Sequence, residues 1–210
     1  MHISEGVLAA PVLAGATVAA GAGLALGLKE LRPNRIPRVA VLSSALFVGS
    51  LIHIPIGPVS VHLVLNGICG LILGWAAFPS ILVALALQAI LFQFGGIVVL
   101  GANTVILALP AVLIHYLCRG MVRGRSHGVA WVGGFTAGAA AIGLGALLLG
   151  GSLTLSGEAF REAAVVAVTA NLPVLFIEGL FTAFCVSFLR KVKPEILGTF
   201  DTLDHPEERL

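Results

Sequence analysis

Charged residues are scarce in this chain of 210 residues. Asp, Glu, Lys and Arg together make up 10% of it, and hydrophobic residues make up 58%. A soluble globular domain carries roughly 25% charged residues, so this composition excludes an ordinary soluble domain and indicates an integral membrane protein. The net charge of +2 is too small to indicate a nucleic-acid partner.

Cysteines are few, and a nucleotide-binding motif is missing. Cys69, Cys118 and Cys185 show no CxxC or paired spacing, so neither a disulfide framework nor a thiolate metal site is predicted. The chain has no Gly-x-x-x-x-Gly-Lys-Ser/Thr motif, and hydrolysis of ATP by this chain is therefore not expected. Ahead of the first apolar run, Glu5 stands where a signal peptide would have a basic region. We therefore expect a mature, extracytoplasmic N-terminus.

The distribution of charge predicts the topology. Ten of the twelve basic residues fall in three clusters: Lys29/Arg32/Arg35/Arg38, Arg119/Arg123/Arg125 and Arg190/Lys191/Lys193. The positive-inside rule assigns all three to the cytoplasmic side. The apolar segments before and between them fit one, four and two crossings at about 20 residues each. We therefore predict an all-α, multi-pass protein of the cell's inner (plasma) membrane, with about seven transmembrane helices. Its N-terminus would lie outside and its C-terminus in the cytoplasm.

Helices are expected at residues 7–28, 38–54, 61–77, 79–94, 99–118, 128–150 and 164–189, the last one broken by Asn171-Leu172-Pro173. They form a single transmembrane domain at 1–193, followed by an acidic cytoplasmic tail at 194–210. The first helix is rich in small residues, which let another helix approach closely, either within this bundle or in a partner.

The N-terminus offers nitrogen ligands. The α-amine of Met1, the amide nitrogen of His2 and its imidazole Nδ1 can close two fused chelate rings around one ion. Such a set suits a divalent ion that favours a tetragonal or square-planar field, and it leaves one in-plane position open. A histidine at position 2 is a weak signal alone, so the case depends on the other histidines.

Two of these histidines fall on the same side of the predicted topology. His53 ends the second expected helix, and the loop from Pro55 to Ser60 delivers His62 to the start of the third. The Gly95-Gly96 loop and Asn103 lie close to the same outer face. Amides there can donate hydrogen bonds to ligating imidazoles, or the loop is a plain tight turn. The convergence of His2, His53 and His62 predicts an extracytoplasmic metal site.

Glu178 lies well inside an expected membrane span. An intramembrane carboxylate is costly and marks a functional or structural position. One hypothesis makes it the proton or ion site of a self-sufficient secondary transporter, although we find no internal repeat of the kind such transporters often show. We favour an internal strut that is neutral or hydrogen-bonded to Asn66, Gln88 or another buried amide. A membrane scaffold or sensor is a third hypothesis, and it would not need His2 and His62 on one side.

Four segments resemble the CbiM/NikM family, the substrate-capture subunits of cobalt and nickel energy-coupling-factor transporters. They are Met-His-Ile-Ser-Glu-Gly at residues 1–6, Pro-Val-Ser-Val-His-Leu at 58–63, the stretch from Leu91 to Asn103, and Asn171-Leu172-Pro173 with Ile177-Glu178-Gly179 and Thr182. Two positions depart from the family pattern. Phe94 stands where an acidic residue is common, and Asn171 stands where a histidine is expected.

The resemblance implies a ligand set and a set of partners. The N-terminus would fold back into the protein, so that Met1 and His2 bind the ion together with His62. His53, Ser60 and Asn103 would support these ligands by hydrogen bonds. The cargo would be Co²⁺ or Ni²⁺, with no permanently bound cofactor. The implied partners are a membrane coupling (T) subunit and cytoplasmic ATPase subunits, with a small accessory membrane subunit as a further candidate.

Overall fold

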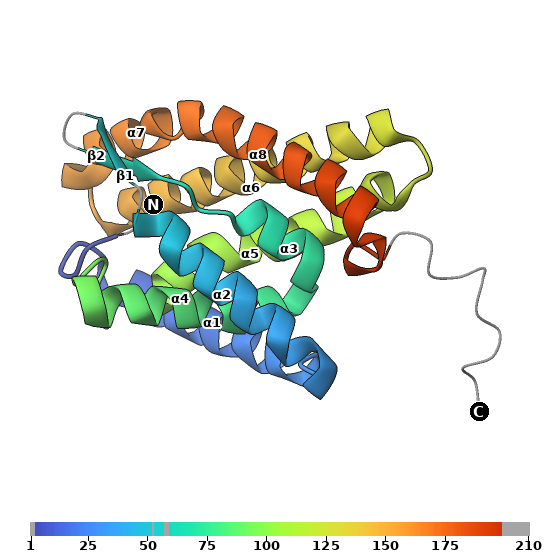
Figure 1. Ribbon diagram of the computed structural model, residues 1–210. Helices are drawn as coiled ribbons and strands as arrows, with labels where there is room; N and C mark the ends of the chain where they lie inside the picture. The colour runs from blue at the N-terminus through green and yellow to red at the C-terminus, as the bar shows by residue number, and fades with distance from the viewer. Residues whose placement is uncertain (1–2, 52, 57–58, 199–210) are drawn as a thin grey trace.

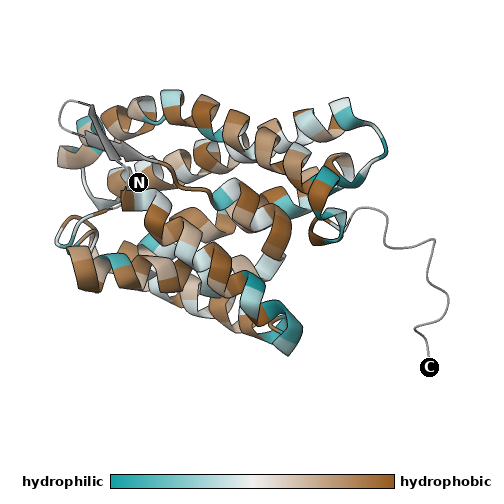
Figure 2. Ribbon diagram, viewed as in Figure 1, coloured by the Kyte–Doolittle hydropathy of each residue, from teal (hydrophilic) through white to brown (hydrophobic). Residues whose placement is uncertain are grey.

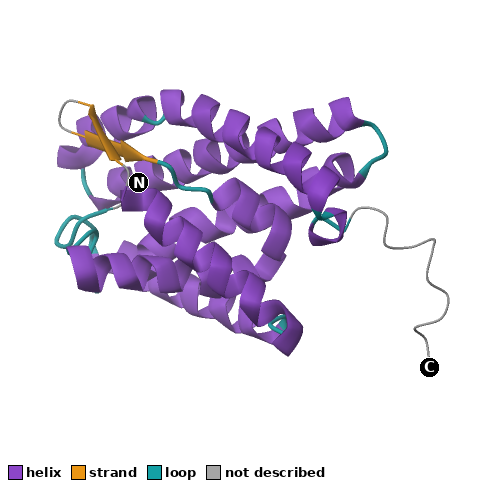
Figure 3. Cartoon of the chain, viewed as in Figure 1, coloured by secondary structure: helices purple, strands orange, loops and turns teal. Residues whose placement is uncertain are grey.

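The computed structural model describes residues 3–51, 53–56 and 59–198, with residues 53–56 and 59–62 described by their backbone. The chain is a bundle of helices with one short β-hairpin (Figures 1 and 3). The helices are α1 (Ala10–Lys29), α2 (Ile36–Leu51), α3 (Asn66–Leu73), α4 (Ala77–Phe92), α5 (Leu100–Arg123), α6 (His127–Ser156), α7 (Arg161–Ala170) and α8 (Leu172–Val192). Short 3-10 turns are η1 (Pro33–Arg35), η2 (Gly74–Ala76), η3 (Glu158–Phe160) and η4 (Pro194–Ile196), and the strands are β1 (His53–Ile56) and β2 (Val59–His62).

Within the described residues, five helical stretches are long and apolar enough to cross a membrane. They are Ala10–Lys29, Asn66–Phe92, Leu100–Arg123, His127–Ser156 and Glu158–Val192. Helix α2 has 16 residues, somewhat fewer than the roughly 20 of a full crossing. The count of seven crossings and the orientation of the two ends stay predictions.

The predicted boundaries are wrong around the hairpin. Residues 53–56 and 59–62 pair as antiparallel strands, where the sequence predicted a helix ending at residue 54, a loop at 55–60 and a helix beginning at residue 61. Pro55 and Pro58 cannot continue a helix, and the β-branched residues between the histidines favour strands. As a result α3 is only eight residues long. The chain changes direction at Gly74, whose φ is +58°, and leads into α4 (Figure 1).

Helices α5 and α6 form the centre of the bundle. Helix α6 packs against α8, α5 and α7, and α5 also packs against α1, α3 and α4. Small residues permit the close approaches that membrane helices use in place of water exclusion. A side chain at Gly138 of α6 would overlap the backbone of Glu178 on α8. The expected break in the last helix is confirmed, because α7 ends at Ala170 and α8 begins at Leu172.

The two described ends of the chain lie at opposite ends of α5. The backbone of Ile3 bonds to Asn103, in the first turn of α5. The carbonyl of Leu197 accepts from Arg123 Nε at 2.9 Å, in the last turn. A helix of 24 residues is about 36 Å long. Hydrophilic residues gather at the α1–α2 and α5–α6 connections, at the end where Leu197 lies (Figure 2).

Arg190 ties α8 to this hydrophilic end. Its side chain is buried, with 6% of its surface exposed, and Nη1 donates to the carbonyls of Val122 and Gly124. These carbonyls end α5 and have no partner within their own helix. A cation at this position also suits the negative end of the helix dipole.

Candidate metal centre

The N-terminal segment is held by the start of α5. Asn103 Oδ1 accepts from the Ile3 amide at 2.9 Å, and Asn103 Nδ2 donates to the Ile3 carbonyl at 3.1 Å. Both residues are buried, Ile3 at 3% exposed and Asn103 at 2%. The carboxamide therefore satisfies both backbone polar groups of the residue that directly follows His2. We call this pair the N-terminal anchor.

Glu5 adds a second contact between the N-terminal segment and the bundle. Its Oε1 accepts from the Val98 amide at 3.0 Å, in the loop between α4 and α5. Gly96 in the same loop has a φ of +122°, and a Cβ at this position would overlap the Glu5 side chain. The Gly95-Gly96 loop thus packs against the segment that follows His2, by a contact for which glycine is required.

The hairpin pairs the two histidines that the sequence placed on the outer side. In its antiparallel register, His53 lies opposite His62 and Pro55 lies opposite Ser60. Strand β2 then leads into Leu63 and Val64. The turn of the hairpin at residues 57–58 lies outside the described residues.

Glu178 holds the chain that follows β2. This side chain of α8 is fully buried, and its Oε1 accepts from the amides of Val64 and, at 2.9 Å, Leu65. These amides precede the first turn of α3, where helix N–H groups lack internal partners and the dipole favours an acceptor. We call this contact the hairpin anchor.

The strut interpretation of Glu178 therefore agrees with its contacts, but the donors are backbone amides rather than Asn66 or Gln88. The second carboxylate oxygen, Oε2, has no partner among the described residues, and the same is true of Thr182 Oγ1 one turn along α8.

The N-terminal anchor and Asn66, which directly follows the hairpin anchor, contact the same face of α5. Asn66 Nδ2 donates to the Leu107 carbonyl at 3.2 Å, and Leu107 stands four residues after Asn103. Residues four apart lie on one helical face, about 6 Å apart along the axis. The segment after His2 and the segment after His62 thus reach α5 one turn apart, although about 60 residues separate them in the sequence.

These contacts do not involve the side chains that the sequence predicts as metal ligands. Met1 and His2 lie outside the described residues, and His53, Ser60 and His62 are described by backbone alone. Among the side chains that are described, no group of three or more His, Cys, Asp or Glu is arranged to hold a metal ion. Asn103 contacts the Ile3 backbone, a role that the sequence did not predict for it.

His115 shows what else the sequence missed. The sequence did not predict its contact with α3, in which Nδ1 lies 3.0 Å from the Gly70 carbonyl and 3.2 Å from the Leu71 carbonyl. It therefore binds the end of α3, just as Glu178 binds the start. The short length of α3, which places its last carbonyls beside α5, was the information that the sequence lacked.

The architecture is that of a polytopic helical membrane protein whose N-terminal segment is folded against the bundle. A family model described as the cobalt uptake substrate-specific transmembrane region, CbiM, matches residues 2–196. This match covers nearly the whole chain, and the chain belongs to the CbiM family.

Similar proteins agree with this assignment. A putative metal transport protein of Haemophilus influenzae is 39% identical over 209 residues, covering 94% of this chain and 97% of the relative. The fused nickel transport protein NikMN of Rhodobacter capsulatus is 31% identical and covers 100% of this chain, which spans 67% of that longer protein. The crystal structure of a transition metal transporter superposes with a TM-score of 0.70 at 26% identity, over 91% of this chain and 93% of the other.

Proposed function

We propose that this chain is the substrate-binding membrane subunit of an energy-coupling-factor importer. It captures Co²⁺ or Ni²⁺ at the extracytoplasmic side, and the ion is taken up at the expense of ATP hydrolysed by partner subunits. The observation that supports the proposal is that the segments following His2 and His62 contact α5 one turn apart, through Ile3 with Asn103 and through Asn66 with Leu107.

The ligands in this proposal are nitrogen atoms. The α-amine of Met1, the amide of His2 and its imidazole form the chelate, and the imidazole of His62 completes the plane. The N-terminal anchor supports this set because it fixes the residue to which His2 is bonded. The hairpin anchor likewise fixes the backbone of Val64, which lies two residues after His62. Sites that hold their ligands in place bind more tightly than sites that must order them first.

The ion choice follows from the same ligands. Four in-plane nitrogens suit a square-planar ion, so Ni²⁺ should bind at least as well as Co²⁺, which needs axial ligands or distortion. His53, opposite His62 in the hairpin, and Ser60 are candidates to support the site. Opposed positions of an antiparallel pair share one face of the ribbon, and the register pairs His53 with His62.

The proposed partners are a membrane coupling subunit and cytoplasmic ATPases. The absence of a phosphate-binding loop in this sequence supports a division of labour, because ATP-driven uptake would then need an ATPase on another chain. The fused relative supports it further, since about a third of that nickel transport protein lies beyond the part that this chain covers. The basic clusters favour a cytoplasmic location for the end of the bundle at which such partners would dock.

The test is a calorimetric titration of the purified chain with Ni²⁺ and with Co²⁺. A matched sample carries one additional residue before Met1, or an acetylated amine, and keeps all six histidines. We expect tight binding by the native chain and its loss in the blocked one. Equal affinity in both samples would remove the amine from the ligand set and would require a site built from His53, His62 and nearby amides.

A self-sufficient secondary transporter is the second candidate. The unpartnered Oε2 of Glu178 in the described structure favours it, because a buried carboxylate with a free oxygen can take up a proton. Uptake into vesicles separates the two proposals. Transport that needs the ATPase module supports the importer subunit, and transport driven by an ion gradient with this chain alone supports the alternative.

A further inference from the structure

The end of the bundle opposite Ile3 contains a basic cavity of about 860 Å³. Its lining includes six basic side chains and two acidic ones: Lys29, Arg32, Arg35, Arg38, Arg119 and Arg123, with Glu30 and Glu195. Within the described part of the chain, the one ion pair is Lys193–Glu195 at 3.8 Å. The positive charge of the cavity is therefore largely uncompensated by carboxylates of the described residues.

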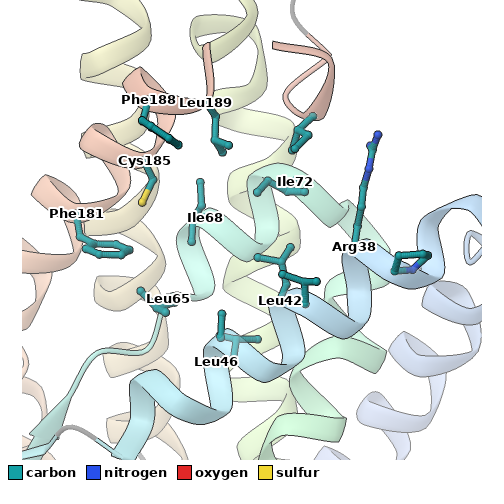
Figure 4. A pocket seen from close by; sticks show the side chains of 14 residues that line it. Arg38, Leu42, Leu46, Leu65, Ile68, Ile72, Phe181, Cys185, Phe188 and Leu189 are labelled. Carbon is teal, nitrogen blue, oxygen red and sulfur yellow. The ribbon is translucent and has the colours of Figure 1, made fainter. Parts of the chain in front are cut away.

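An apolar groove of about 500 Å³ adjoins this basic cavity. It lies between α2 and α8, with α3 behind it, and Figure 4 shows Leu42, Ile68 and Phe188 from these three helices directed into it. Its lining is apolar except for Arg38, which stands at one end of the groove (Figure 4). Arg38, Ile72 and Ile196 line both the groove and the cavity, so the two form one continuous site.

The groove alone would not select an occupant in a membrane. Lipid tails are as apolar as leucine, so an apolar surface there gains little from a protein partner through water exclusion. Selection has to come from the basic end. Basic pockets between transmembrane helices bind the headgroups of anionic lipids, and each Lys or Arg near the surface contributes to the attraction. Arginine is suited to phosphate because its planar guanidinium can donate two parallel hydrogen bonds.

We propose that the groove and the basic cavity bind one anionic phospholipid, with an acyl chain between α2 and α8 and the phosphate against Arg35 and Arg38. The composition of the site supports this occupant, since an apolar groove lined by α2, α3 and α8 continues into a cluster of arginines at the end of the bundle. A bound lipid would bridge α2 and α8 where they are separated by the groove. This inference does not depend on the metal site.

The test measures lipid retained by the purified full chain, by native mass spectrometry in a series of phosphatidylglycerol and phosphatidylcholine additions with identical acyl chains. We expect preferential binding of phosphatidylglycerol. Arg38→Gln should lower this preference about fivefold, and Arg35→Gln with Arg38→Gln roughly thirtyfold. Arg161→Gln, at the start of α7 and the other end of the bundle, is the matched control and should leave it unchanged. Both arginines of the double variant are exposed, so folding should be retained and is checked by melting temperature.

A second variant tests the groove. Ala45 lines it and is exposed, so Ala45→Phe should fill part of the space and weaken binding of the phospholipid without a change of charge. Glycerol 3-phosphate, which has the phosphate and no acyl chain, should compete poorly. Displacement by glycerol phosphate as readily as by phospholipid would show that the groove takes no part, and the proposal would fail.

Two further results would overturn it. The first is equal retention of the two lipids by the unaltered chain. The second is a preference that appears only after the tail acids Asp201, Asp204, Glu207 and Glu208 are replaced by amides. That outcome would mean that the acidic C-terminal tail, rather than a phospholipid, binds the basic cavity in the unaltered chain.

Discussion

Asn103 makes two hydrogen bonds to one residue, accepting from the Ile3 amide and donating to the Ile3 carbonyl. A carboxamide can do both, whereas a carboxylate can only accept and an alkyl group can do neither. Asn103→Asp should therefore lose one bond and bury a charge, and Asn103→Leu should lose both. We expect metal affinity to fall by about 10–100-fold, as for other residues that support ligands. Calorimetry measures this loss.

The control for Asn103 is Asn171→Ala. Asn171 lies between α7 and α8, and its Nδ2 donates to the Ala167 carbonyl of α7 at 2.7 Å. A similar drop in affinity for Asn171→Ala would mean that the loss reflects general destabilisation rather than release of Ile3.

A side chain at position 96 should also weaken metal binding. Gly96→Ala places a Cβ against Glu5 at a φ that L-residues rarely adopt. We expect weaker metal binding and a lower melting temperature, because Glu5 must leave the Val98 amide. Gly15→Ala is the matched control, since a Cβ there has nothing within 4 Å. If both variants bind the ion with native affinity, the Glu5 contact has no influence on the site.

Glu178→Gln should keep metal binding and cost mainly stability. The Gln carbonyl oxygen can still accept from Val64 and Leu65, but these bonds lose the strength that a charged acceptor gives. Glu178→Leu should release the backbone and weaken metal binding as well. Thermal denaturation and calorimetry together distinguish the two variants. A pH-dependent uptake that disappears in Glu178→Gln, with folding and binding intact, would support the secondary transporter.

Replacing His62 should lower the metal affinity far more than replacing His53, its partner in the hairpin. His62→Ala should abolish tight metal binding, because it removes the fourth nitrogen of the plane. His53→Ala should weaken binding within about 10–100-fold, as expected for a supporting residue. Isothermal titration of both variants with Ni²⁺ gives the comparison. Complete loss in both would show that the ligand set is incomplete as proposed.

The topology can be checked with single cysteines. After the three native cysteines are replaced, a cysteine near residue 7 should react with an impermeant reagent added outside cells, and one near residue 198 should react only after permeabilisation. The expectation follows from the three basic clusters and from the location of Ile3 and Leu197 at opposite ends of α5. Labelling of both positions from one side would exclude an odd number of crossings.

Most helix positions could be predicted from the sequence, and the contacts that shape the site could not. Long uncharged runs bounded by basic residues predict spans, and Asn171-Leu172-Pro173 predicted a break that the structure contains. The hairpin was missed because residues 53–62 carry no formal charge, like the spans on either side, so a search for uncharged runs bounded by basic residues does not separate strand from helix there. Its prolines and β-branched residues were the available signal.

The hydrogen-bond partners of Asn103 and Glu178 also could not be predicted from the sequence. Sequence patterns indicate that a buried polar side chain needs a partner, but not whether this partner is a side chain or a backbone group. Ile3, Val64 and Leu65 are apolar residues with no outward sign of a polar role. Their involvement depends on where their backbone lies, which follows from the packing of α3 and α5.

Both anchors hold main-chain atoms, and this affects how related sequences can diverge. One apolar residue can replace another at positions 3, 64 and 65 without removing a hydrogen bond, as long as the packing is kept. The residues that make the bonds, Asn103 and Glu178, have no such freedom. Among homologues, we therefore expect more variable side chains at positions 64 and 65 than at the positions of Asn103 and Glu178. An ion site arranged in this way can be retained while many of the apolar side chains around it are replaced during evolution.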